Sequence, residues 1–245
     1  MRIKLEFKGN NVVLPRGFKK YQQALIYNVM TKGEAEWLHD KAYQFEEKTY
    51  KLFTFSSILE RGKFHTRKKK FFFPDNISFI ISSPVEHIIE EIAKGVMKHD
   101  KVKLKNNIMK VKSVDVLKKR DIENDKIKVN ALTPIEVHET LYKPNGDKKT
   151  YYYTPFENEF NKRVNENLKR KWQAYHNEKC PYDLKIKPLF SGNKNERIQY
   201  FDNTIIKAWK GHFELKGDPE FLEFGYYAGL GSRNSQGYGM VNILE

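Results

Sequence analysis

The predicted order of strands and helices constrains this chain most, because one order occurs in both halves of its 245 residues. Charged and apolar residues alternate around Ile3, Leu5 and Phe7, and this period of two is typical of a half-buried strand. A helix is predicted from about Lys19 to Met30, where apolar residues recur every four positions. The first half is completed by a short helix over 34–42, strands over 51–58, 71–73 and 77–82, a helix starting at Ser83-Pro84-Val85-Glu86, and strands over 102–105 and 108–117.

The first half therefore has the strand-helix-strand-strand-helix-strand order of a ferredoxin-like fold. A polar, charged stretch over 118–126 is the predicted domain boundary, and the pattern recurs after it, although the residues themselves do not. Strands are predicted over 127–132, 135–142, 148–153, 184–189, 205–215 and 240–244, with an Asn-Gly hairpin turn over 144–147 and helices that begin at Pro155 and at Asp218.

Two apolar faces are expected in this second half. The strand over 205–215 is expected to turn Ile205, Trp209 and Phe213 to one side. The helix from Pro155 is expected to bury residues at a strict four-residue spacing, namely Phe156, Phe160, Val164, Leu168 and Trp172.

Four glycines near the C-terminus form two Gly-x-Gly pairs, Gly229-Leu-Gly231 and Gly237-Tyr-Gly239. Glycine permits positive φ and close backbone approach, and successive N–H groups in such a loop can form a nest for phosphate oxygens. Between the pairs, Arg233 adds a fixed charge, while Asn234 and Ser235 add hydrogen-bonding groups. A tight connection between a helix and the last strand would use the same glycines, so both interpretations stay open.

The composition indicates a polyanionic partner. Lys and Arg number 45 against 31 Asp and Glu, a formal net charge of +14, which favours nucleic acid ahead of an acidic membrane surface. Cys180 is the one cysteine, which excludes an intrachain disulfide and a Cys-based metal site and fits a reducing cytoplasm. The N-terminus does not resemble a secretory signal, and no apolar run approaches the ~18 residues of a membrane span.

Seven histidines are present, and histidine is the side chain best suited to proton transfer near neutral pH. His39 lies in the predicted short helix beside Trp37 and Leu38. A packed or capping role is open for it too, so these residues alone do not assign it a chemical function.

Several stretches, taken together, match the pattern of a known family. They are Ala24–Asn28, Leu38-His39, Lys51–Ser56, Leu132–Ile135, the glycine loop with its five-residue spacing, and Met240-Val241. The chain in this way resembles the CRISPR-associated endoribonucleases of the RAMP superfamily, which process precursor CRISPR RNA. The resemblance covers essentially the whole chain. It implies an α+β fold of two tandem ferredoxin-like, RRM-like domains over 1–120 and 126–245, each an antiparallel sheet with helices on one face.

The resemblance also implies a cytoplasmic endoribonuclease that uses no metal and no cofactor, with His39 and Tyr27 as the acid–base pair and Lys51 as the stabilising cation. In such cleavage the ribose 2′-hydroxyl attacks its own 3′-phosphate, which leaves a 2′,3′-cyclic phosphate and a 5′-hydroxyl. One group takes the 2′ proton and another protonates the 5′-oxygen, and the sequence leaves open which residue does which. The alternatives are a core aromatic at Tyr27 and an ordinary strand lysine at Lys51.

Basic residues predict where RNA would lie. The segment over 61–70 runs beside Phe64 and Phe71, so it could follow a phosphate backbone while the rings stack on bases; a solvated loop is the alternative. Lys185 and Lys187 lie two apart on a strand and should share one face. The predicted RNA-binding residues are Arg61, Arg67, Lys69, Lys148, Lys185 and Lys187, with Gly229, Gly231, Arg233, Asn234, Ser235, Gly237 and Gly239 of the glycine loop.

The partner implied is CRISPR repeat RNA, single-stranded or hairpin, without a membrane. Contacts with other CRISPR effector subunits and a homodimer are compatible with the sequence but leave no trace in it. A non-catalytic RNA-binding subunit of a CRISPR ribonucleoprotein is the alternative function. The presence of Tyr27, His39 and Lys51 favours the enzyme, which requires these three residues to converge near the glycine loop.

Overall fold

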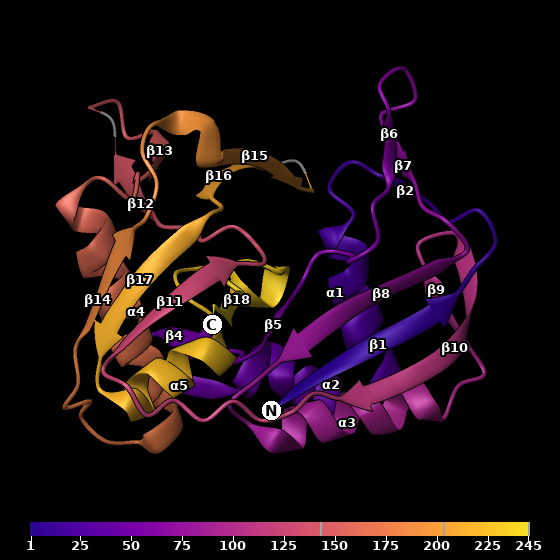
Figure 1. The fold of residues 1–245 in the computed structure, drawn as a ribbon, viewed down its shortest axis with the longest axis horizontal. Coiled ribbons are helices and arrows are strands. Elements are labelled where there is room, and N and C mark those ends of the chain that lie inside the picture. The colour runs from indigo at the N-terminus through magenta and orange to yellow at the C-terminus, as the bar shows by residue number, and fades with distance from the viewer. Residues whose placement is uncertain (143, 203, 245) are drawn as a thin grey trace.

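A computed structural model describes residues 1–142, 144–202 and 204–244 of the chain. It confirms an α+β fold of two tandem ferredoxin-like domains, which lie side by side, each with its own antiparallel sheet (Figure 1). Residues 117–125, all of them described, connect the last strand of the first half to the first strand of the second without forming helix or strand.

The sheet of the first half is centred on the N-terminal strand. Its elements are β1 (Arg2–Lys8), α1 (Lys19–Val29), β5 (Thr54–Phe55), β8 (Asn76–Ser82), α3 (Glu86–Met97), β9 (Lys101–Leu104) and β10 (Asn107–Val116). The strand order β5-β8-β1-β10-β9 is the ferredoxin-like order with β9 added at one edge. Ile3, Leu5 and Phe7 of β1 are fully buried, so the predicted alternation is confirmed.

The two helices of this half cross closely. A Cβ atom at Gly95 of α3 would lie 1.9 Å from the carbonyl oxygen of Val29, at the end of α1, so only glycine fits there. The first turn of α3 begins later than predicted, because Ser83 does not cap it. Its hydroxyl donates to the Leu52 carbonyl and accepts from the Val85 N–H, which fixes the turn before the helix instead.

The second half repeats this plan. Its elements are β11 (Lys126–Ala131), α4 (Asn158–His176), β14 (Leu184–Pro188), β17 (His212–Gly217), α5 (Pro219–Ala228) and β18 (Val241–Ile243). The strand order β14-β17-β11-β18 is again ferredoxin-like. Asp218 caps α5 as predicted, since its carboxylate accepts from the Glu220 N–H. The predicted face of α4 is buried except at Phe156, which precedes the helix and is 47% exposed.

Small hairpins extend from these two bodies. They are β2 (Val13–Pro15) with β7 (Lys70–Phe72) and β6 (Lys63–His65), β3 (Tyr43–Phe45) with β4 (Lys48–Tyr50), β12 (His138–Tyr142) with β13 (Lys148–Tyr152), and β15 (Glu196–Phe201) with β16 (Thr204–Trp209). Short helical turns complete the chain: α2 (Lys32–Glu36), the π-helical η1 (Trp37–Lys41), and the 3₁₀ turns η2 (Asn193–Asn195) and η3 (Asn234–Gln236).

The strand predictions differed most from the structure in two places. The stretch over 205–215 is two strands, because the chain turns at Gly211, where a Cβ atom would lie 2.6 Å from the Asn195 amide nitrogen. Ile205 is consequently 52% exposed while Trp209 and Phe213 are buried. The stretch over 51–58 is strand only in β5, because Leu52 has φ of 50° and interrupts the extended backbone.

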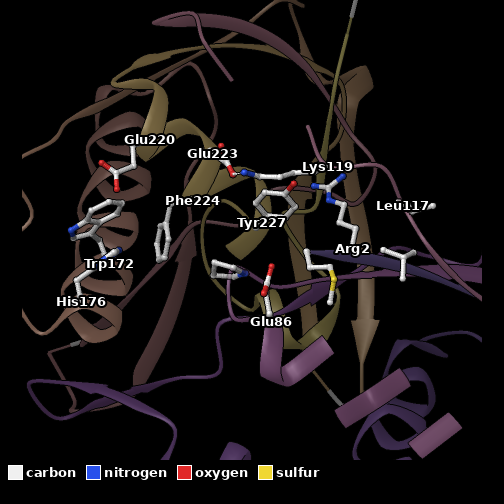
Figure 2. Close-up of a pocket in the computed structure, with 13 residues that line it drawn as sticks. Arg2, Glu86, Leu117, Lys119, Trp172, His176, Glu220, Glu223, Phe224 and Tyr227 are labelled. Atoms are coloured by element: carbon white, nitrogen blue, oxygen red, sulfur yellow. Dashed lines mark ion pairs between the residues drawn. The ribbon is translucent and has the colours of Figure 1, made fainter. Parts of the chain in front are cut away.

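Arg2 of β1 joins the two halves. Its guanidinium is buried, donates to the carbonyls of Tyr226 and Val241, and lies 3.5 Å from the centre of the Tyr226 ring. Burial lowers the pKa of Arg2 to about 10. A cavity of 440 Å³ opens beside this junction, and its lining includes Arg2, Glu86 and Trp172 (Figure 2). Within the described residues, none of the helices combines the length and apolar character needed to cross a membrane.

Candidate functional site

Tyr27, His39 and Lys51 come from three separate segments of the first half and meet in one place. Tyr27 lies on α1, His39 in η1 and Lys51 directly after β4. The rings of Tyr27 and His39 pack edge to face, with their centres 5.8 Å apart. The Lys51 ammonium donates to the backbone carbonyl of His39. The predicted set is therefore grouped in space, on one side of the first domain.

The π-helical turn η1 determines which side chains face solvent. Leu38 is fully buried, whereas the His39 imidazole that follows it is 67% exposed. The Nδ1 atom of His39 lies 2.5 Å from a carboxylate oxygen of Asp40. Because a carboxylate only accepts, this contact assigns the proton to Nδ1 and leaves Nε2 of the neutral ring as an acceptor. Sequence reasoning missed Asp40, although an acidic neighbour of a candidate histidine is a readable signal.

The surroundings of Tyr27 and Lys51 shift their pKa values in opposite directions. Burial, with a smaller contribution from the Asp40 charge, raises the pKa of Tyr27, so its hydroxyl keeps its proton well above neutral pH. Partial burial lowers the pKa of Lys51, while the Asp40 charge acts in the opposite direction. With the imidazole in its neutral form, the group presents an acceptor nitrogen, a protonated hydroxyl and an ammonium.

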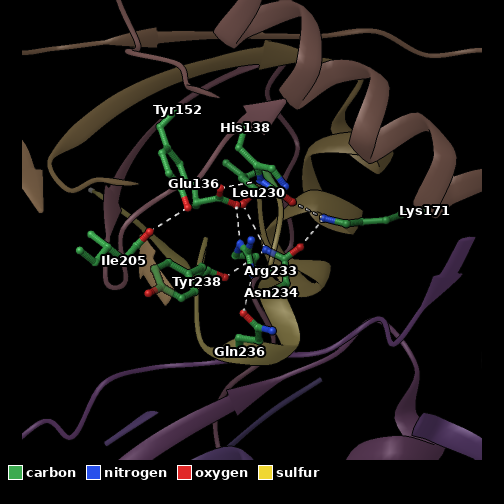
Figure 3. Close-up of polar contacts among 11 residues, drawn as sticks. Glu136, His138, Tyr152, Lys171, Ile205, Leu230, Arg233, Asn234, Gln236 and Tyr238 are labelled. Carbon is green, nitrogen blue, oxygen red and sulfur yellow. Dashed lines mark hydrogen bonds and ion pairs between the residues drawn. The ribbon is translucent and has the colours of Figure 1, made fainter. Parts of the chain in front are cut away.

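The glycine loop is held from inside by a buried lysine. All four of its predicted glycines have positive φ. Lys171 of α4 donates to the carbonyls of Gly229 and Gly231 at 2.9 and 3.0 Å and to the Asn234 side-chain oxygen at 2.5 Å (Figure 3). Sequence reasoning missed Lys171, whose signal is a cation next to Trp172 on the apolar face of a helix.

The polar side chains of the loop are largely used within the protein. The Asn234 amide donates to the carbonyls of Leu230 and Tyr238, so this side chain is fixed within the loop. Arg233 lies 3.7 Å from the fully buried Glu136 carboxylate. That carboxylate also contacts His138 at 2.6 Å (Figure 3). The arginine is still 24% exposed.

A cavity of 210 Å³ connects this loop to the first domain. Its lining includes Lys51 from the predicted set together with Ser232, Arg233 and Ser235 of the loop. The predicted approach of Lys51 to the glycine loop is thus present in the structure. Tyr27 and His39 are not among the residues lining this cavity. The His39 carbonyl accepts from Lys51, and the Tyr27 ring packs edge to face on Phe53, which also lines the cavity.

The predicted RNA-binding lysines and arginines outside the loop are exposed but do not form one patch. Arg61, Arg67 and Lys69 are on or beside the β6–β7 hairpin, which projects from the first domain, whereas Lys148 begins β13 in the second domain (Figure 1). Lys185 and Lys187 of β14 are both exposed between buried neighbours, as the period of two predicts. Their role in binding RNA stays a prediction.

No group of three or more His, Cys, Asp or Glu side chains within residues 1–142, 144–202 and 204–244 is arranged to hold a metal ion.

Comparison with known proteins covers nearly the whole chain. Residues 13–115 match the family model for the N-terminal part of CRISPR-associated protein Cas6, and residues 117–243 match the model for its C-terminal part. A CRISPR-associated endoribonuclease Cas6 1 of Methanocaldococcus jannaschii is 31% identical, across 100% of this chain and 93% of the relative. A CRISPR-associated endoribonuclease Cas6 of Pyrococcus furiosus is 27% identical, across 99% and 88%. A solved structure of a CRISPR-associated protein Cas6 superposes with a TM-score of 0.80 at 26% identity, across 100% and 99%. The chain belongs to the Cas6 family of CRISPR-associated proteins.

Proposed function

We propose that this chain is a metal-independent endoribonuclease that cuts CRISPR repeat RNA to release guide RNAs. The observation that carries the proposal is the grouping of Tyr27, His39 and Lys51, an acid, a base and a cation that three separate segments bring together. Two relatives named as CRISPR-associated endoribonucleases support the same reaction class.

The reaction we propose needs no group beyond these side chains and the RNA. The 2′-oxygen attacks the adjacent phosphorus, the bond from phosphorus to the 5′-oxygen breaks, and a 2′,3′-cyclic phosphate and a 5′-hydroxyl result. His39 Nε2 takes the 2′ proton, because Asp40 occupies Nδ1. Tyr27 protonates the leaving 5′-oxygen, since its raised pKa keeps the hydroxyl protonated. The Lys51 ammonium exchanges its contact with the His39 carbonyl for a phosphate oxygen.

Lys51 is suited to stabilising the charge that develops on phosphorus. Its side chain is half-buried, and it lines the cavity that Arg233 and Ser235 of the glycine loop also line. A fixed cation in a partly dry site stabilises a developing oxyanion more than it does in water. We propose that the scissile phosphate enters beside this cavity, with the loop arginine as a second positive charge.

The test is cleavage of repeat RNA from the host's own CRISPR array in excess chelator. Wild type should cut and leave a cyclic phosphate, and a substrate with 2′-deoxyribose immediately upstream of the cut should stay intact. His39→Ala should reduce the single-turnover rate by about 100- to 10,000-fold with little change in RNA affinity.

His99→Ala, which alters an exposed histidine beyond the end of α3, is the matched control and should cut at the wild-type rate. Normal cutting of the deoxy substrate would exclude the mechanism. Tight binding by the wild type without any product would instead identify a non-catalytic RNA-binding subunit.

A further inference from the structure

A further cavity, of 430 Å³, lies between the two domains, and its lining does not include Tyr27, His39 or Lys51. One wall belongs to the first domain and includes Phe64 and Phe71 of the β6–β7 hairpin. The opposite wall is strand β15 of the second domain, which sequence reasoning did not predict. Arg16, Lys19 and Tyr200 also line it.

The walls are largely apolar and open to solvent. Phe64 and Phe71 lie with ring centres 4.8 Å apart, and Phe18 packs edge to face on Phe71 at 5.7 Å. Phe64 is 42% exposed, and Ile198 across the cavity is 51% exposed. Large apolar side chains left open around one cavity mark a surface for a ligand, and an exposed ring such as that of Phe64 is suited to stacking on a planar ring.

The polar groups in this cavity favour an anionic ligand. The Arg16 guanidinium lies 4.2 Å from the centre of the Tyr200 ring, at the border between the domains. Gly17 has φ of 80°, and a Cβ atom there would lie 2.7 Å from the Tyr200 carbonyl oxygen, so glycine allows the two walls to approach. The hairpin beside the cavity carries exposed cations, namely Lys63, Arg67, Lys68, Lys69 and Lys70. A nucleotide joins a planar aromatic base to an anionic phosphate, and the exposed ring and the cations here suit these two parts.

We propose that this cavity binds one unpaired nucleobase of the RNA, with Phe64 as its stacking residue and Arg16 beside the adjoining phosphate. The inference rests on the proposed function, because it takes the ligand to be RNA. Lys19 connects this subsite to the glycine loop: its buried ammonium donates to the Gln199 side chain at 3.0 Å and to the Gly237 carbonyl at 2.6 Å. A base held here would fix the position of the RNA relative to the loop, remote from the bond that is cut.

The experiment measures the affinity of repeat RNA that carries 2′-deoxyribose at the cut site, so that binding is read without cleavage. Phe64→Leu keeps an apolar side chain but removes the ring, and it should weaken binding by about tenfold. Phe64→Trp keeps a ring and should bind as tightly as the wild type or more tightly. Ile108→Ala, which truncates a side chain that is 69% exposed on β10, is the control and should leave the affinity unchanged.

A series of RNAs, each lacking one base, then identifies the base. One abasic position should weaken binding to the wild type and cause no further loss with Phe64→Leu. Equal affinity of Phe64→Leu and wild type, or abasic losses that simply add to the Phe64→Leu loss at every position, would overturn the subsite. The two proposals can also fail separately. If one abasic position weakens binding to the wild type but causes no further loss with Phe64→Leu, and the wild type never cuts RNA, the proposed enzyme is refuted and the subsite is supported.

Discussion

At the scale of single residues, the candidate reaction centre depends on what surrounds each group rather than on residue type. Tyr27 and Lys51 have shifted pKa values mainly because they are partly buried. The imidazole of His39 stays exposed because Leu38 occupies the interior position of the same turn. Residue types in a sequence name candidates for acid, base and cation, whereas burial and neighbours assign the roles.

Lys51 gives the first prediction at this scale. Because burial lowers its pKa, the ammonium loses its proton at a lower pH than an exposed lysine, whose pKa is about 10.4. The single-turnover rate of the wild type should therefore fall at alkaline pH before an ordinary lysine would titrate. Lys51→Arg should move this fall to higher pH, since arginine stays charged.

A second variant of the same residue tests how much the cation contributes. Lys51→Met should reduce the single-turnover rate by about 100-fold, the usual cost of losing one preorganised charge partner in a reaction centre. Lys48→Met, which changes an exposed lysine on β4, should cut normally. Identical rates for Lys51→Met and wild type, or identical pH profiles for Lys51→Arg and wild type, would remove Lys51 from the mechanism.

At the scale of elements, the glycine loop depends on α4. Lys171 is 4% exposed and contacts two loop carbonyls and the Asn234 side chain, so this helix positions a loop some sixty residues further along the chain. The predicted phosphate nest would be formed by backbone N–H groups of the loop. The Lys171 ammonium instead donates to backbone carbonyls of the same loop. The same loop thus has a structural role that does not depend on any ligand.

Lys171→Met changes a buried side chain and should destabilise the fold. The loop acceptors would lose a buried donor, and each buried acceptor left unpaired costs about 1–3 kcal/mol, so the free energy of unfolding should fall by at least a few kcal/mol. Chemical denaturation measures this fall, and Lys179→Met, at an exposed position beyond α4, should change it by less than about 0.5 kcal/mol. If Lys171→Met is as stable as Lys179→Met, the contacts of Lys171 with the glycine loop do not stabilise the fold.

The elements also show how much of the fold and of the candidate site could be predicted from the sequence. Period-two alternation in β1 and four-residue spacing in α4 predicted both ferredoxin-like halves, because each half buries one face of its sheet against helices. Strand β15 was missed because its exposed, mixed side chains lack that alternation. Lys171 was missed because its partners in the glycine loop meet it only in the folded chain. Tyr27, His39 and Lys51 were identified as a set only through a family resemblance.

At the scale of the whole molecule, two buried cations hold the halves together. Arg2 of the first domain donates to carbonyls of Tyr226 and Val241 in the second. Lys19 of α1 reaches Gly237 of the glycine loop and lies 4.1 Å from the centre of the Tyr238 ring. Both interactions fix the relative position of the domains, and the cavities that we assign to RNA lie at or near that border.

Lys19 makes the stability of the molecule depend on pH. Burial, with the nearby charge of Lys210, lowers the pKa of Lys19 to about 7 in the folded protein, against about 10.4 for an unfolded lysine. Between these values the unfolded chain binds a proton that the folded chain does not, so the free energy of unfolding should rise with pH from about 7 to 10. One such proton gives a slope of about 1.4 kcal/mol per pH unit.

The unfolding free energies of the wild type and of Lys19→Met are measured by denaturation from pH 6 to 10. At each pH the value for Lys19→Met is subtracted from the value for the wild type, which isolates the slope due to Lys19. Other titrating groups cancel in this difference, which should rise from about pH 7 and be flat below it, where both states of Lys19 are protonated. A difference that is flat across the whole range would mean that the ammonium stays charged in the folded protein. Lys19 would then hold Gly237 as a permanent cation, and the border between the domains would be insensitive to pH at this point.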